Sequence, residues 1–152
     1  MTGGDGFIGE GGGNLLNRNE IKRSKEFAKT GRRLIREIPE LKFISENKCK
    51  VAFLTSEQEK TSGGGQKKVF GQCIKVSEQY QWICPYHFMI IVYSQNCAGF
   101  SDKQYEILLL HELLHIGFKE DSIEPMFYIR EHDYEEFRQI VDKYGLEWSE
   151  LQ

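Results

Sequence analysis

The sequence has no apolar run long enough to cross a lipid bilayer. Its longest uninterrupted apolar stretch, Phe88–Tyr93, has the length of a strand, whereas a transmembrane helix needs about 20 apolar residues. The segment Met1–Gly6 also lacks the basic region that precedes the apolar core of a secretory signal. We therefore expect a protein without membrane segments that is located in the cytoplasm.

Closely spaced cysteine pairs are absent as well. The chain has four cysteines, Cys49, Cys73, Cys84 and Cys97, and no Cys-x-x-Cys motif. A zinc ribbon needs two such close pairs, so this class of zinc site is excluded. Because the chain is too large and too apolar to need disulfides, we expect the four cysteines to be reduced and half-buried, in or near strands.

Length and composition indicate one globular domain. The chain has 152 residues, of which 39% are hydrophobic and 28% are charged, as in an ordinary domain with a buried core. Seven of the first thirteen residues are glycine, a composition typical of a flexible tail. We expect a glycine-rich tail over residues 1–17 and a single domain over residues 18–152.

Charge is unevenly distributed along the chain, although the net charge is only −3. Residues 18–36 hold eight Lys or Arg against two Glu, and residues 119–152 hold ten Asp or Glu against four Lys or Arg. The basic segment permits a polyanionic partner, but a solvated face or pairing between the two segments explains it equally simply. Its only aromatic residue is Phe27, so nucleic acid is a second-rank candidate partner.

Hydrophobic periodicity predicts an α+β fold with helices on one face of a small mixed sheet of three to four strands. The predicted helices cover residues 19–38, 103–118 and 133–144; they are bounded by Pro39, by a cap at Ser101 or Asp102, and by Gly145. The predicted strands cover residues 50–55, 68–76 and 88–93, with a loop at 61–65 and an irregular connection at 119–130. The third strand is apolar on both faces, so we expect both to be covered.

One motif carries a specific chemical signal. Residues 111–115 read His-Glu-Leu-Leu-His, a pattern that arises by chance in about one chain in a hundred of this composition. On a helix His111 and His115 lie one turn apart on one face, where both imidazoles can bind one Zn²⁺. Glu112 then lies beside the metal, where a general base must stand to take a proton from a metal-bound water.

A catalytic zinc needs a third protein ligand. Metzincins place Gly and His at the positions that are Phe118 and Asp121 here, so this chain is not a metzincin. His132 is the only histidine after the motif, and it starts the last predicted helix, from which it can point back across a groove. We favour His132 as the third ligand. The alternatives are Glu135 or Glu136 and, less favoured, Asp121.

Other polar side chains near the motif have two readings each. Asp133 either holds the second nitrogen of a ligating histidine or caps the last helix. Tyr128, Arg130 and Tyr134 are candidates for stabilising an oxyanion, although packing or surface roles are commoner for such residues. His87 precedes the third strand, where a single histidine is usually structural.

The motifs together resemble a metallopeptidase family found in phages and bacterial mobile elements. The resemblance covers about residues 20–148 and is carried by Val69–Gly71, Ile90–Tyr93, Leu108–Gly117, His132–Phe137 and Tyr144–Trp148. It implies a minimal zincin-like fold with an N-terminal helix, a small mixed sheet, the motif-bearing helix and a C-terminal helix. It also implies a zinc site of His111, His115 and His132 with Glu112 as general base.

The layout is more distantly similar to that of SprT-like proteases, which act on DNA-bound proteins. Those proteases often carry a separate zinc ribbon, which this sequence lacks, so this likeness adds little.

The sequence thus predicts a zinc-dependent peptidase that acts on a protein or peptide. We expect an extended substrate to pair with an edge of the third strand. The alternative is a non-catalytic, metal-stabilised module that binds nucleic acid or a protein partner through the basic first helix. Neither the substrate nor the oligomeric state follows from the sequence.

Overall fold

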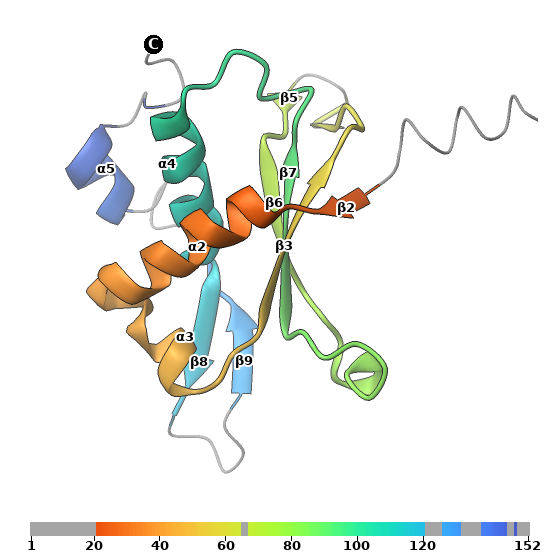
Figure 1. Cartoon of the computed structure of the whole chain (residues 1–152), viewed down its shortest axis with the longest axis vertical. Helices are drawn as coiled ribbons and strands as arrows, with labels where there is room; N and C mark the ends of the chain where they lie inside the picture. Colours follow the sequence, from red (N-terminus) through yellow and green to blue (C-terminus); the bar gives the residue numbers. More distant parts are fainter. Residues whose placement is uncertain (1–20, 65–66, 121–125, 132–137, 146–147, 149–152) are drawn as a thin grey trace, which may run out of the picture.

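A four-stranded mixed sheet with helices on one side forms the body of the protein (Figure 1). The computed structural model describes residues 21–64, 67–120, 126–131, 138–145 and 148. The predicted glycine-rich tail lies outside these residues. The α+β class expected from the sequence is confirmed.

The sheet has the strand order β2-β3-β7-β6. Its strands are β2 (Ile21–Arg23), β3 (Val51–Ser56), β6 (Gly71–Lys75) and β7 (Phe88–Tyr93). The β3 and β7 strands are parallel, and the two outer strands are antiparallel to their neighbours. The central position of β7 explains its continuous apolar sequence, because a strand paired at both edges and covered on its faces has few exposed positions.

The first helix starts later than predicted. Residues 21–23 form β2, which pairs with the end of β3, and α2 covers Lys25–Glu37. Ser24 separates the two elements: its backbone is extended and its hydroxyl accepts a hydrogen bond from the Phe27 amide. An N-cap at this position ends the strand and begins the helix. The predicted helical start at residue 19 was therefore wrong, whereas the predicted end before Pro39 is confirmed.

The second predicted strand is divided. Residues 67–68 form β5 (Lys67–Lys68), which pairs with β4 (Thr61–Ser62) in the region predicted as a loop, and β6 begins only at Gly71. Val69 lies between the two strands: its amide donates to the Lys60 carbonyl, and its carbonyl accepts from the Asn96 side chain. A local side-chain hydrogen bond thus takes the place of ladder pairing.

The motif-bearing helix is shorter than predicted. The α4 helix covers Asp102–Leu113, and a Ser101–Gln104 capping box fixes its start. Residues 116–119, predicted as helix, form β8 (Ile116–Lys119), which pairs with β9 (Met126–Ile129) from the connection predicted to be irregular. Both predictions were wrong because the pairing of two short segments across a connection leaves little periodic signal.

Short helical segments complete the chain. They are η1 (Pro39–Leu41), α3 (Lys42–Glu46), η2 (Glu78–Tyr80) and α5 (Arg138–Tyr144). Gly145, next to the end of α5, has φ +88°, the left-handed conformation expected of a residue that closes a helix. No helix among the described residues is long and apolar enough to cross a membrane.

The core lies between the sheet and the helices. Phe88, Ile90 and Val92 of β7 are completely buried in one cluster with Ile107 and Leu109 of α4. Each such side chain contributes about 1.5–3 kcal/mol through burial. This packing holds α4 firmly against the sheet.

Close packing also brings α2 onto the sheet. A Cβ at Gly31 would lie 2.3 Å from ring atoms of the buried Phe53, so only glycine permits this approach of helix and strand. All four cysteines are free: Cys97 is buried and the other three are half-buried. The expectation of reduced cysteines is thus consistent with the fold.

Candidate metal centre

The His-Glu-Leu-Leu-His motif occupies the C-terminal end of α4 and the turn that follows it. His111 and Glu112 lie in the last turn of the helix, which ends at Leu113. Leu114 keeps helical backbone angles, and the His115 amide donates to the Glu112 carbonyl. His115 is therefore held one turn beyond His111, although it lies outside the regular helix.

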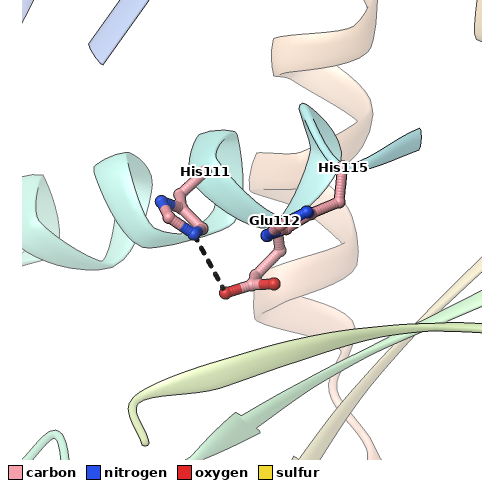
Figure 2. A group of neighbouring side chains, drawn as sticks. All are labelled: His111, Glu112 and His115. Carbon is pink, nitrogen blue, oxygen red and sulfur yellow. Dashed lines mark ion pairs between the residues drawn. The ribbon is translucent and has the colours of Figure 1, made fainter. Parts of the chain in front are cut away.

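The three polar side chains of the motif form one group (Figure 2). One ligand atom from each of His111, Glu112 and His115 lies within 4.8 Å of the other two. The Nε2 atom of His111 is 3.9 Å from the Oε2 atom of Glu112. Two imidazoles and a carboxylate at this spacing are a donor set that suits zinc and related transition metals.

A backbone carbonyl orients His115. Its Nδ1 atom lies 2.7 Å from the carbonyl oxygen of Arg130, and the Arg130 amide donates to the His115 carbonyl. Because a carbonyl only accepts hydrogen bonds, Nδ1 carries the proton and Nε2 keeps a free lone pair. A ligating histidine usually donates its other N–H to such a group. The arrangement therefore prepares His115 to bind a metal through Nε2.

Sequence analysis missed this role of Arg130. It assigned the orienting group to a side chain, Asp133, and considered Arg130 for its charge. The contact depends on the β8–β9 pairing, which continues the register from Ile116 opposite Ile129 to His115 opposite Arg130. A carbonyl is present in every residue, so only the pairing itself could have identified this one.

The Glu112 carboxylate is buried against the outer strand of the sheet. Glu112 is 4% exposed, and a Cβ at Gly71 of β6 would lie 3.3 Å from its Oε2 atom. Burial raises the pKa of the neighbouring Cys73 thiol and of Tyr93, and the charge of Glu112 raises both further. A buried carboxylate is costly without compensation, and a cation beside it would supply that compensation.

The predicted substrate edge was wrong. Both edges of β7 are paired, one with β3 and one with β6, so β7 has no edge for a peptide. The outer strand on this side of the sheet is β6, which lies against α4 at Gly71. The error arose because an apolar strand before the motif was assumed to be an outer strand.

Two candidates for oxyanion stabilisation have other contacts. The Tyr128 ring packs against Gly117, and the Lys119 ammonium lies 5.4 Å from the ring centroid. The guanidinium of Arg130 donates to the Leu114 carbonyl at 3.4 Å. A role for either side chain in stabilising an oxyanion stays a prediction.

His87 has a structural role, as expected. Its Nδ1 atom accepts a hydrogen bond from the Lys50 amide, and its ring packs 4.9 Å from that of Phe127. Burial lowers the pKa of His87, and the charges of Lys50 and Lys75 lower it further.

The remaining predicted site residues lie outside the described part of the chain. They are Asp121, His132, Asp133, Tyr134, Glu135 and Glu136. The structure thus brings together the motif residues and leaves the third ligand as a prediction.

Comparison with known families agrees with this centre. A family profile described as "Putative phage metallopeptidase" matches residues 19–152. The chain belongs to this family. Comparisons with curated proteins and with solved structures gave no match.

Membership of the phage metallopeptidase family indicates a metal-dependent protease that acts on proteins or peptides. The metal-binding group required for such an activity is present as His111, Glu112 and His115. The matched span starts just before β2 and includes the whole described fold.

Proposed function

We propose that this protein is a zinc peptidase in which His111, His115 and His132 hold the metal and Glu112 is the general base. The observation that carries the proposal is the group of His111, Glu112 and His115 at the end of α4, with His115 oriented by a backbone carbonyl. His132 enters from the sequence, as the only histidine after the motif.

The bound zinc would lower the pKa of a water and polarise the scissile carbonyl. The Glu112 carboxylate takes the proton of that water at an oxygen and passes it to the leaving amine. Its burial suits this task, because a proton acceptor withdrawn from bulk water keeps a fixed position. The Arg130 carbonyl keeps the proton of His115 at Nδ1 throughout.

We propose β6 as the strand that binds an extended substrate. The Tyr93 amide donates to the Phe70 carbonyl, and the Val76 amide donates to the His87 carbonyl. In an antiparallel ladder this register turns the backbone groups of alternate residues, Gly71, Cys73 and Lys75, away from β7. These outward groups lie next to Glu112 and can pair with a peptide backbone.

The first test replaces the general base. Glu112→Gln keeps the shape of the side chain but cannot accept the proton, so we expect hydrolysis of an unfolded protein substrate to fall by about 10²–10⁴-fold. Zinc content, measured by mass spectrometry, stays at the wild-type value. Glu57→Gln, a change at an exposed glutamate outside the motif, serves as the control and keeps full activity.

Two results would contradict this assignment. Undiminished hydrolysis by Glu112→Gln would exclude Glu112 as the base, and loss of zinc would make Glu112 a ligand. A wild-type protein that holds zinc but hydrolyses no substrate would favour the non-catalytic, metal-stabilised module.

The second test concerns the third ligand. We expect the wild-type protein to bind one zinc per chain and His132→Ala to bind it far more weakly, because a structural set of three ligands loses one. Metal content of both proteins, purified identically without chelator, measures this. Zinc retained by His132→Ala would transfer the third-ligand role to Glu135, Glu136 or Asp121.

A further inference from the structure

A stripe of positive charge runs along the outer side of α2. Lys25, Lys29, Arg32 and Arg36 follow one another at intervals of four, three and four residues. At 100° per residue they share one face, and at 1.5 Å per residue the stripe is about 16 Å long. All four side chains are exposed, while Gly31, Leu34 and Ile35 are buried.

The charge of this stripe is not used within the described fold. Arg33, on a different side of α2, pairs with Glu37 and Glu106. Within the described ranges, no ion pair joins the stripe to any carboxylate, including those of residues 119–120, 131 and 142. The solvated stripe thus has charge available for a partner.

A cavity of about 490 Å³ lies beside the stripe, between α2, α3 and the start of β3. Its cationic lining residues are Arg32, Arg36 and Lys50, and no acidic residue lines it. A cleft with cations of one sign concentrates the field and attracts anions.

The connection between β6 and β7 brings an aromatic ring to this basic cavity. Tyr86 lines the cavity, and the guanidinium of Arg23 from β2 lies 5.2 Å from the centroid of its ring. Tyr86 lies 50 residues beyond Arg36 in the sequence, so no inspection of the basic segment reveals the pair. The fold supplies the aromatic side chain that the basic segment lacks.

We propose that this cavity and stripe bind single-stranded nucleic acid, with the phosphates on Arg32, Arg36 and Lys50 and a base on Tyr86. Proteins that bind single strands combine a basic groove with aromatic rings on which bases stack. A duplex is a poorer fit, because its bases are stacked on each other and cannot reach a ring inside a cavity.

This surface is separate from the metal centre. None of the residues that line the cavity comes from α4 or β6, the elements that hold the motif group and the proposed substrate edge. The inference therefore does not rest on the proposed peptidase function, and its test needs no catalytic activity.

The experiment measures binding of a labelled oligonucleotide of about 15 nucleotides, in DNA and RNA forms, by fluorescence anisotropy over a range of salt concentrations. We expect Arg32→Ala/Arg36→Ala to weaken binding about tenfold or more at low salt, and to reduce the slope of log K against log salt by about 1.4, since each lost phosphate contact on a single strand contributes about 0.7. Alanine favours helix, so α2 is retained.

Two matched comparisons distinguish the site from general electrostatics. Lys67→Ala/Lys68→Ala removes the same charge from exposed positions of the β4–β5 hairpin, and it should bind like the wild type. Tyr86→Leu should weaken binding about five- to hundredfold through loss of stacking, and Tyr86→Phe, which keeps the ring, should restore it. Circular dichroism of each variant establishes that the fold is intact.

Several outcomes would overturn the proposal. They are the absence of salt-dependent binding, equal losses in the two double variants, and tighter binding of the duplex than of the single strand. A loss in Arg32→Ala/Arg36→Ala with none in Tyr86→Leu would mean that the surface binds phosphates or other polyanions without reading single-stranded bases, and this too overturns it.

Discussion

His115 illustrates how one backbone atom prepares a side chain for chemistry. Hydrogen bonding of Nδ1 to the Arg130 carbonyl fixes both the tautomer and the direction of the ring. The carbonyl is itself held by the β8–β9 pairing, in which Gly117 lies opposite Tyr128. The metal-binding competence of His115 therefore depends on residues that touch no metal.

Gly117→Ala tests this dependence. A Cβ at position 117 would lie 2.4 Å from the Tyr128 ring, so the ring and its strand must move. We expect the free energy of unfolding to fall by about 1–3 kcal/mol through overpacking, and zinc affinity to fall with the displacement of Arg130. Chemical denaturation and zinc titration measure the two effects.

The second variant for this prediction is Gly117→Ala/Tyr128→Ala. Removal of the ring gives the new methyl group space, so the double variant should bind zinc more tightly than Gly117→Ala alone. Equal zinc affinity in wild type and Gly117→Ala would show that the hairpin does not position His115.

At the scale of elements, Glu106 joins three helices. It lies in α4 and pairs with Arg33 of α2 and with Lys103, and it accepts a hydrogen bond from the Tyr144 hydroxyl of α5 at 3.4 Å. Burial by itself raises the pKa of Glu106, but the hydrogen bond from Arg33 and the charges of Lys103 and Arg33 lower it overall. These contacts hold the helical layer in register over the sheet.

The lowered pKa of Glu106 predicts a pH dependence of stability. Since the folded state binds the proton less tightly than the unfolded state, the contribution is present above the ordinary glutamate pKa and disappears as the pH falls through the lower, folded value. We expect Glu106→Gln to lose about 1 kcal/mol at neutral pH, a value limited by the partial exposure of the pair. The loss should shrink in acid.

Urea denaturation at a series of pH values measures this difference. Glu57→Gln, in an exposed connection, should differ little from the wild type at every pH. A stability loss in Glu106→Gln that stays constant down to strongly acidic pH would contradict an ionic contribution.

At the scale of the whole molecule, two functional surfaces lie on different elements. The motif group and the proposed substrate strand belong to α4, β8 and β6, whereas the basic cavity belongs to α2, α3, β3 and the β6–β7 connection. Figure 1 shows α2 crossing the molecule in front of α4. One chain can therefore bind a strand of nucleic acid while the metal centre stays accessible.

The sequence by itself determined the features that have a local physical cause. Helical spacing placed His111 and His115 on one side of α4, Pro39 ended the first helix, and a run of apolar residues defined β7. Each depends on backbone geometry within a few residues, so periodicity and terminators suffice to predict it.

Only the tertiary structure decided which segments meet. The pairing of β8 with β9 supplies the Arg130 carbonyl to His115, the position of β7 between two strands transfers the proposed substrate edge to β6, and Tyr86 reaches the basic stripe across 50 residues. Such contacts depend on the burial and register of distant segments, which leave no period in the local sequence.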